Sequence, residues 1–334
     1  MEHPLIVAGI CVPERRRYAA ALAEMTARRL VRISERPRVR REDHDLIPSE
    51  RSLGSGELWR IVADIGTEID LPHLDLATDP RIPVVCVVDA LHLLEDLADR
   101  HPLIEAARPG DDRGDVGARA RRAVSFIEGA TLISFVNWET VDTARLALVM
   151  TIASHLNPAA RVRLSRGPAD DIRALTSGPQ VSPPLLERAG WVHMLNDEHD
   201  PHMTDARVTT LRYEQPRPFH PARLAAALDD IESGRHGHIL RSAGFCRLAT
   251  RASVLARWDH VGSAIWLDPL SSDLDAAPTV QDIAFTGLGV DAHMLRAALD
   301  DAAVTDDELM AGPTAWLDFE DPLPTWPSIV EKRP

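Results

Sequence analysis

The stretch Arg217-Pro-Phe-His-Pro-Ala-Arg-Leu224 opens the region of the sequence, residues 212–309, that decides the fold. Pro221 fits the first turn of a helix, because the N–H that proline lacks has no partner there. Leu224 and Ile231 follow at the spacing of one helix face. The stretch therefore predicts a helix that starts at Pro221 and runs to Gly234.

Two strands and a second helix are predicted after this first helix. The run Gly244 to Thr250 alternates apolar and polar residues, which is typical of a half-buried strand. A second strand, residues 282–286, leads through glycines into a helix over residues 292–302, with Leu295 and Leu299 on its buried side. Together these elements predict one small α+β domain.

This order of residues resembles the C-terminal domain of the CobW family, the metallochaperone-type P-loop GTPases. The residues up to Leu224 are similar to the family's Pro-Phe/Leu-x-Pro-x-Arg-Leu, and Arg241-Ser-Ala-Gly-Phe245 is similar to its Arg-x-Lys-Gly-Phe, with Ala243 in place of the lysine. The resemblance implies a doubly wound α/β domain of the P-loop, Rossmann-type class, followed by the α+β CobW C-terminal domain. It implies little about activity, because the family's chemistry resides in the other domain.

The first strand and helix stand where a phosphate-binding loop would be expected. Leu5-Ile-Val-Ala-Gly-Ile-Cys-Val12 is a continuous apolar run of the kind found in a strand buried on both faces, and Pro13 then opens a helix. The phosphate loop needs Gly-x-x-x-x-Gly-Lys-Ser/Thr, because backbone N–H groups, the lysine and the hydroxyl hold the phosphates and Mg²⁺. With Gly9 as the first glycine, the next three signature positions fall on Glu14, Arg15 and Arg16.

Most of these changes oppose phosphate binding. Pro13 removes a backbone donor, Glu14 brings an anion to the phosphates, and Arg16 has no hydroxyl for a metal. Arg15 preserves a positive charge, although a guanidinium does not substitute freely for the compact ammonium of lysine. We therefore do not expect GTP and Mg²⁺ to bind here in the usual way.

The strand end that would select guanine is altered as well. Thr131-Leu-Ile-Ser-Phe-Val-Asn-Trp138 reads as a buried strand, which a GTPase would end in Asn-Lys-x-Asp. Asn137 remains, but Trp138 replaces the lysine and Thr140 replaces the aspartate. Trp138 either fills the pocket or stacks on a base. Gly9, Arg15 and Asn137 are thus interpreted as a vestigial nucleotide site.

Candidate metal ligands gather in one later segment. His193, Glu198, His199 and His202 lie close together in the sequence, and imidazole and carboxylate ligands suit Zn²⁺. The alternative is a polar, solvated linker. The resemblance implies a Cys-x-Cys-Cys metal motif between the early strands. This sequence has no cysteine in that region, so the motif is missing. Asp89, near the end of a buried apolar run, either caps the following helix or faces a metal.

Composition bounds the class of protein. The 334 residues predict about two domains, and the formal charge of -14 argues against specific DNA binding and against an anionic membrane surface. Cys11, Cys86 and Cys246 lie far apart and predict no disulfide framework, which fits a reducing cytoplasm. No apolar run reaches the length of a membrane span. A cytoplasmic protein is therefore expected.

The expected division of the chain follows from these segments. Residues 1–180 would form the degenerate P-loop GTPase-like domain, residues 181–311 the CobW C-terminal α+β domain, and residues 312–334 a Pro/Trp-rich tail, with a Pro/Ser/Gly linker at the first boundary. The tail is predicted to be too rich in proline for a helix. Trp316 and Trp326 are expected to pack back over the C-terminal domain.

These interpretations favour a binding or adaptor protein over an enzyme. The leading hypothesis is a CobW-like pseudo-GTPase linked by the resemblance to zinc or cobalt homeostasis or to a stress response, with Zn²⁺ as a possible ligand and a protein partner. The alternative is a slow, divergent GTPase that delivers a divalent metal. Residues 14–41 carry ten arginines and three glutamates and would offer a docking surface for an anionic partner such as the ribosome; a solvated face is the other reading.

Overall fold

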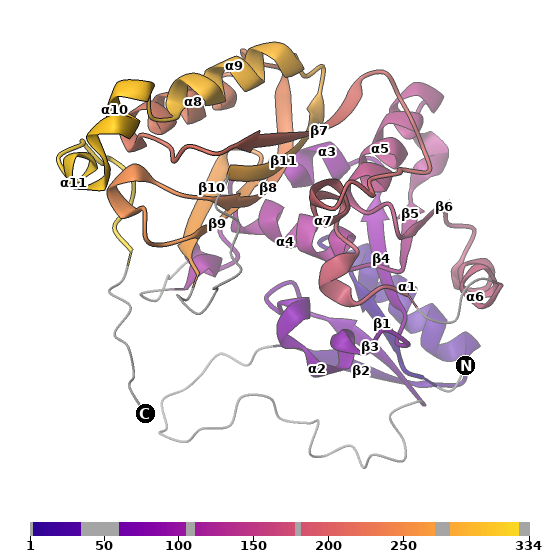
Figure 1. Ribbon diagram of the computed structural model, residues 1–334. Helices are drawn as coiled ribbons and strands as arrows, with labels where there is room; N and C mark the ends of the chain where they lie inside the picture. Colours follow the sequence, from indigo (N-terminus) through magenta and orange to yellow (C-terminus); the bar gives the residue numbers. More distant parts are fainter. Residues whose placement is uncertain (1–2, 35–59, 105–110, 178–181, 271–280, 327–334) are drawn as a thin grey trace, which may run out of the picture. The chain divides into compact units, whose positions relative to one another are not determined.

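The computed structural model describes residues 3–34, 60–104, 111–177, 182–270 and 281–326 (Figure 1). The chain divides into two compact units. The first comprises Met1–His193 and Asp200–Asp205, and the second comprises Met194–His199 and Ala206–Pro334.

The first unit is built on a six-stranded sheet with the order β2-β3-β1-β4-β5-β6, in which every strand pair is parallel. Its strands are β1 (Leu5–Ala8), β2 (Arg29–Ile33), β3 (Ile61–Ile65), β4 (Val84–Asp89), β5 (Leu132–Val136) and β6 (Arg161–Leu164). The residues of β1, β3 and β4 are all buried, as expected for a parallel sheet with both faces covered.

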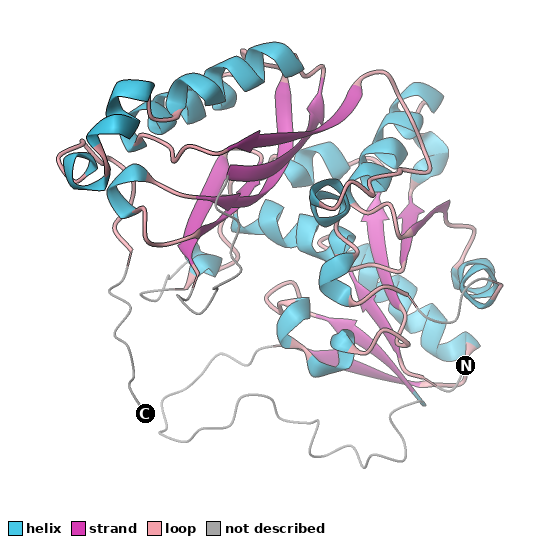
Figure 2. Cartoon of the chain, viewed as in Figure 1, coloured by secondary structure: helices cyan, strands magenta, loops and turns pink. Residues whose placement is uncertain are grey.

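Helices cover this sheet (Figure 2). They are α1 (Val12–Met25), α2 (Asp75–Thr78), α3 (Leu93–Leu97), α4 (Ala118–Glu128), α5 (Thr143–Leu156), α6 (Pro168–Thr176) and α7 (Gly190–Leu195). Tyr18 and Leu22 of α1 pack with Val7 and Val87 on one face, where α6 joins them. Phe135 of β5 is also fully buried, and α4 packs between α3 and α5. The doubly wound α/β prediction is confirmed.

The second unit contains a five-stranded antiparallel sheet with the order β10-β9-β8-β11-β7. Its strands are β7 (Val208–Gln215), β8 (His238–Cys246), β9 (Ala256–Val261), β10 (Ala264–Pro269) and β11 (Gln281–Leu288). Helices α8 (Pro221–Glu232) and α9 (Ala292–Ala302) pack side by side on it. The α+β prediction for this part of the chain is confirmed.

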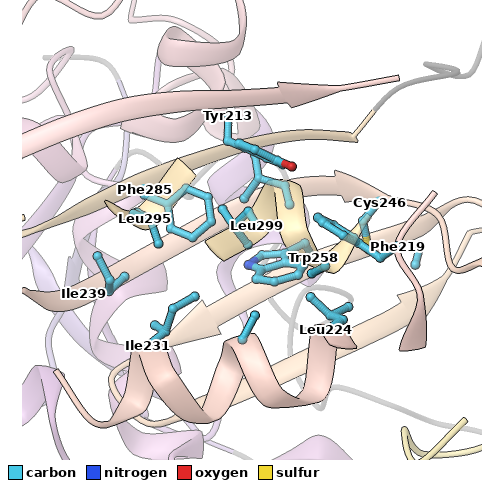
Figure 3. Packing of buried hydrophobic residues seen from close by; sticks show 14 of the residues in the cluster. Tyr213, Phe219, Leu224, Ile231, Ile239, Cys246, Trp258, Phe285, Leu295 and Leu299 are labelled. Carbon is cyan, nitrogen blue, oxygen red and sulfur yellow. The ribbon is translucent and has the colours of Figure 1, made fainter. Parts of the chain in front are cut away.

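Aromatic side chains fill the space between these helices and the sheet (Figure 3). The Trp258 ring lies 6.3 Å from the Phe219 ring and 6.2 Å from the Phe285 ring, measured between centroids. The indole N–H of Trp258 donates a hydrogen bond to Ser242 Oγ at 2.8 Å, so the buried polar atom is satisfied. Leu224 and Leu295, which the sequence placed on the buried helix faces, are fully buried in this core.

Gly244 is required where β8 and β11 approach each other. Its φ is +154°, and a Cβ atom there would lie 2.0 Å from the carbonyl oxygen of Asp282. The Gly-Phe pair of the sequence motif is therefore fixed by strand packing.

Several element boundaries differ from the predicted ones. β1 ends at Ala8, because Gly9 begins the turn into α1, whereas the apolar run had predicted a strand to Val12. β8 spans His238–Cys246, earlier than the predicted strand at 244–250. The polar alternation of β7, β9 and β10 was not recognised as strand.

The segment after α9 contains two more helices, and the second of them corrects the expectation of a helix-free tail over residues 312–334. α10 (Asp306–Ala311) begins with a capping box between Thr305 and Glu308, and the single-turn helix α11 (Pro313–Trp316) starts on a proline at its first position. The predicted aromatic packing is confirmed: Trp316 is buried against Ala249, and the indole N–H of Trp326 donates to the carbonyl oxygen of Leu267 at 2.7 Å.

Candidate functional site

The candidate site lies at the carboxyl ends of β1 and β4, which are adjacent parallel strands. Three residues, Gly9, Ile10 and Cys11, join β1 to the first turn of α1. Gly9 has a φ of +148°, and a Cβ atom at this position would meet the carbonyl oxygen of Val87 at 2.4 Å. The close approach of the two strand ends therefore requires a glycine, whether or not a phosphate is bound.

Arg15 does not face the end of the sheet as a free cation. Its Nε donates to Asp64 Oδ1 at 2.7 Å, and its Nη1 donates to the carbonyl oxygen of Gly9 at 2.7 Å. The side chains of Arg15 and Asp64 are 3% and 2% exposed. Asp64 ends β3 next to β1 and also lies 3.5 Å from Arg32 Nε. The guanidinium at the position of the phosphate-binding lysine thus neutralises a carboxylate of the protein itself.

The backbone at this position is a short turn. α1 already begins at Val12, so Glu14 lies in its first turn, and Pro13 supplies no N–H there. An eight-residue phosphate loop must wrap around its ligand before the helix starts. The turn of three residues leaves no such wrap between β1 and α1.

Three metal-ligating side chains converge beside this turn. Among the described residues, one group of three or more His, Cys, Asp or Glu side chains has its ligand atoms within 4.8 Å of one another, and it consists of Cys11, Glu14 and Asp89. Cys11 precedes the first residue of α1, Glu14 is in its first turn, and Asp89 ends β4. Sequence analysis did not predict this group, because 75 or more residues separate Asp89 from the other two; only the adjacency of β1 and β4 brings them together.

Hydrogen bonds orient the members of this group. The buried carboxylate of Asp89 accepts from the backbone N–H of Leu91 at 2.9 Å and from Asn137 Nδ2 at 2.8 Å. Glu14 Oε1 accepts from Arg17 Nη2 at 2.6 Å, and the Arg17 side chain is 72% exposed. Asp89 therefore caps the turn after β4 and not helix α3, whose N-cap is His92 without a side-chain cap hydrogen bond, so the predicted helix-capping role is wrong. Its carboxylate lies with Cys11 and Glu14, and its role toward a metal stays a prediction.

The thiol of Cys11 is held in its neutral form. Its Sγ donates to Asp96 Oδ2 of α3 at 3.4 Å. Burial, followed by the negative charge of Asp96, raises the pKa of the Cys11 thiol to about 12. Burial also raises the pKa of Asp96 to about 6. The site therefore concentrates acidic groups in a partly desolvated place, where each disfavours ionisation of the next.

Asn137 and Trp138, at the end of β5, are both engaged within the first unit. Asn137 adopts a left-handed backbone with φ of +57° and donates its side-chain amide to Asp89. The indole N–H of Trp138 donates to the carbonyl oxygen of Ser165 at 2.8 Å. Of the vestigial nucleotide residues, Asn137 thus lies directly against the Cys11–Glu14–Asp89 group.

The other predicted ligands are divided between the two units. His193 and His202 belong to the first unit, and Glu198 and His199 to the second. His193 is half-buried in α7 with no hydrogen-bond partner for its Nε2, whereas Glu198 and His202 are exposed. In the part of the chain that the structure describes, these four side chains do not appear in a converging metal-ligand group. Their role as ligands stays a prediction.

The predicted basic docking segment is described in part. Arg16 and Arg29 are exposed, whereas Arg15 is buried and Arg28 Nη1 donates to the carbonyl oxygen of His3 at 2.7 Å. Residues 35–41, with their further arginines, lie outside the described residues. Across the described chain, no helix is long and apolar enough to cross a membrane.

Residues 208–303 match the family model for the cobalamin synthesis protein cobW C-terminal domain. This part of the second unit is therefore similar to the C-terminal domain of the CobW family. The match covers β7 through α9, the same elements that the opening sequence motif predicted. The CobW resemblance is thereby confirmed.

Two relatives extend the similarity to both units. The zinc-regulated GTPase metalloprotein activator 1 of Dictyostelium discoideum is 23% identical over 320 residues, which cover 88% of this chain and 66% of the relative. A zinc chaperone of Mycobacterium tuberculosis is 27% identical over 243 residues, which cover 65% of this chain and 57% of the relative. The chain therefore matches about two thirds or less of the length of these relatives.

One solved structure is similar over most of both chains. The crystal structure of the Zn(II)-bound YjiA GTPase from E. coli aligns with 90% of this chain and 99% of its own, with 12% sequence identity and a TM-score of 0.36.

Proposed function

We propose that this chain is a CobW-type pseudo-GTPase that acts as a binding or adaptor protein in zinc or cobalt homeostasis or in a stress response. The observation that carries this proposal is the buried ion pair between Arg15 and Asp64, with an Nε to Oδ1 distance of 2.7 Å. A phosphate-binding cation must be available to the γ- and β-phosphates. The guanidinium of Arg15 is instead paired with the carboxylate of Asp64, whose side chain is 2% exposed.

The surroundings of Arg15 support the same proposal. Glu14 stands in the first turn of α1, where a phosphate would meet the helix N-terminus. A carboxylate there repels the anion that the helix end would otherwise attract. Pro13 removes one of the backbone donors. Binding of a nucleoside triphosphate in the usual P-loop manner would place a phosphate beside the carboxylate of Glu14. It would also lack a backbone N–H from Pro13 and a free cation at Arg15.

The link to metal rests on the relatives. Two of them are named as a zinc-regulated GTPase metalloprotein activator and as a zinc chaperone. A scaffold that keeps both domains while its phosphate loop changes would bind partners or metal without a nucleotide cycle. A cytoplasmic location, a protein partner and Zn²⁺ as ligand belong to this proposal.

The basic segment supplies a surface for an anionic partner, with the ribosome as the test case. Arg16, Arg29 and Arg32 are exposed, and each would contribute to attraction toward phosphate groups. Reversing Arg16 and Arg29 to glutamate, together with Arg32→Gln because Arg32 also lies 3.5 Å from the buried Asp64, should abolish cosedimentation with ribosomes at low salt. Reversal of the exposed Arg173, which lies outside the segment, is the matched control. Unchanged cosedimentation of the triple variant would refute this docking site.

A slow, divergent GTPase that delivers a divalent metal is the second candidate, and the names of the relatives favour it. Isothermal titration of the full chain with GTP and Mg²⁺, with and without Zn²⁺, separates the two. The pseudo-GTPase gives no heat and no thermal stabilisation at millimolar nucleotide. Saturable micromolar binding would overturn it, because ligand at about 100 times its Kd stabilises the folded state by about 2.7 kcal/mol.

Hydrolysis, if it is observed, has its own control. Arg15→Ala removes the one cation at the lysine position while Asp64 stays in place. A GTPase that uses Arg15 loses its activity in this variant. Hydrolysis that persists in Arg15→Ala would exclude that mechanism and point to a contaminating enzyme or to another site.

A further inference from the structure

The Cys11–Glu14–Asp89 group has the composition of a cation site. A thiol sulfur and two carboxylates, from the start of α1 and the end of β4, hold their ligand atoms within 4.8 Å of one another. Zn²⁺ takes sulfur and carboxylate oxygen at about 2.3 Å and about 2.0–2.2 Å. Two ligand atoms on such an ion are therefore separated by less than the sum of these bonds, so small side-chain movements would bring the three atoms around one ion.

The position of the group in the sheet is a second, independent observation. The strand order β2-β3-β1-β4-β5-β6 reverses direction between β1 and β4, since the chain leaves β1 toward β2 and β3 and then returns to β4 on the other side. In open α/β sheets, ligands bind outside the carboxyl ends of the strands at this switch point. Cys11 and Glu14 follow β1, and Asp89 ends β4, so the three side chains border that crevice.

Neighbouring groups already orient the ligands as a metal site requires. Ligating carboxylates are themselves held by hydrogen bonds from outer groups. Asp89 receives two, from the Leu91 N–H and the Asn137 amide, and each of its oxygens keeps further lone pairs. Asp96 Oδ2, at 3.4 Å from Cys11 Sγ, accepts the hydrogen bond of the thiol and so fixes the direction of the sulfur.

We propose that Cys11, Glu14 and Asp89 bind a divalent, thiophilic metal ion of the zinc class at the switch point of the parallel sheet. On binding, the S–H bond of Cys11 breaks, a sulfur–metal bond forms, and the proton passes to the buffer. The inference rests on the proposed function and deepens it. It assigns a metal ion to the carboxyl ends of β1 and β4, where the proposed pseudo-GTPase no longer binds nucleotide. The two carboxylates and the thiolate also outweigh the partial positive charge at the N-terminus of α1.

Arg17 is the group that competes with the metal for Glu14. It donates to Glu14 Oε1 at 2.6 Å, but its side chain is 72% exposed and can turn into solvent. An exposed ion pair of this kind contributes little to stability. Breaking the Arg17–Glu14 ion pair therefore costs little free energy and leaves Glu14 available to the metal ion.

The test is a titration of the full chain with Co²⁺ and then Zn²⁺, in the absence of nucleotide. One equivalent of Co²⁺ should give a thiolate-to-cobalt charge-transfer band, and Zn²⁺ should displace it. Cys11→Ser should abolish the band and weaken Zn²⁺ binding by at least about 100-fold, since it removes a ligand and not merely an outer partner. Glu14→Gln and Asp89→Asn should each weaken Zn²⁺ binding. Cys246→Ser, which removes a buried thiol of the other unit, should leave the band unchanged.

Alkylation of the unaltered chain provides a readout that does not depend on the folding of a variant. Bound Zn²⁺ should slow iodoacetamide labelling of Cys11, as followed by mass spectrometry. A band that survives Cys11→Ser, labelling of Cys11 that Zn²⁺ does not slow, or loss of binding in a His199→Ala/His202→Ala variant would each overturn the proposed site.

These failures remain distinct from failure of the pseudo-GTPase proposal. A chain that binds neither GTP nor Zn²⁺ overturns the metal site alone. A chain that binds GTP at micromolar concentration and binds metal only in its presence overturns both.

Discussion

In each unit, an arginine and an aspartate among the described residues form a buried ion pair, and the two pairs differ in what surrounds them. In the first unit, Arg15 and Asp64 are 3% and 2% exposed at the carboxyl end of a parallel sheet. In the second, Arg241 and Asp259 are both 5% exposed between the neighbouring strands β8 and β9. The same interaction is thus found once at the edge where ligands bind and once inside an antiparallel sheet.

The difference shows that the position of an ion pair decides its meaning. Arg241 also donates to the carbonyl oxygens of Ser242 and His260, so its pair fastens two strands beside the Trp258 core. Arg15 also donates to the carbonyl oxygen of Gly9 and so fastens the turn between β1 and α1. Both pairs therefore bear on stability, and the first also stands at the carboxyl end of a parallel sheet, where ligands bind in folds of this kind.

Breaking either pair from one side should have the largest effect. Arg15→Met and Arg241→Met each remove the guanidinium that is hydrogen-bonded to a buried carboxylate, which costs about 3–5 kcal/mol of unfolding free energy. The loss is expected at the lower end of this range for Arg15→Met, because Arg32 still lies 3.5 Å from Asp64. Guanidinium unfolding of each full-length variant measures the loss. Replacing both partners at once, as in Arg15→Met with Asp64→Leu, should recover most of it, because no charge stays buried. A loss below about 1 kcal/mol for Arg15→Met would show that Asp64 is hydrated and that the pair does not close the turn.

Acid should weaken the second unit through His260, which lies beside its ion pair. Burial, and then the charge of Arg241, lowers the pKa of His260 to about 4, and its ring contacts Ser242 at 3.2 Å. In the unfolded chain His260 has an ordinary histidine pKa of about 6.5. Between that pH and the lower pKa of the folded state, the unfolded chain therefore binds a proton that the folded chain does not bind. Stability is therefore complete above pH about 6.5 and falls as the pH drops toward about 4, by a total of about 3 kcal/mol.

Variants isolate this titration from that of the carboxylates. Unfolding free energies measured from pH 7 to pH 4 should show a shallower slope in His260→Gln. The exposed His202→Gln is the matched control and should keep the slope. Equal slopes in all three proteins would mean that His260 is protonated in the folded state and that the ion pair beside it accommodates the charge.

Sequence reasoning was most successful where packing decides the structure. The helices that start at Pro221 and Ala292 begin where the proline, the preceding glycines and the apolar spacing indicated. Gly244 and Phe245 marked strand β8, which pairs with β11. These signals are local, because a helix start or a close strand approach leaves its mark in a few consecutive residues. The buried strands of the first unit were recognised for the same reason.

The candidate site could be predicted only in part. Gly9 and Asn137 directly follow β1 and β5, as expected from the sequence, and Arg15 lies in the first turn of α1, but the partner of Arg15 was not foreseen, since Asp64 is 49 residues away. The convergence of Cys11 and Glu14 with Asp89 likewise depends on which strands are neighbours. Strands β9 and β10 were missed because charged residues such as Arg257 and Asp268 interrupt their apolar pattern.

The smallest expected effects come from removing one side-chain hydrogen bond in each unit, and only the bond in the first unit should also affect metal binding. Asn137→Gly tolerates the left-handed backbone and removes one hydrogen bond to Asp89, while Ser242→Ala removes the acceptor of the Trp258 indole. Each should lower the unfolding free energy by about 1–2 kcal/mol. Only Asn137→Gly should also weaken Zn²⁺ binding, by about 10-fold, because outer partners orient metal-ligating carboxylates. Equal zinc affinities in the two variants, measured by competition with a chelating dye, would remove Asn137 from the metal site and leave it a structural residue like Ser242.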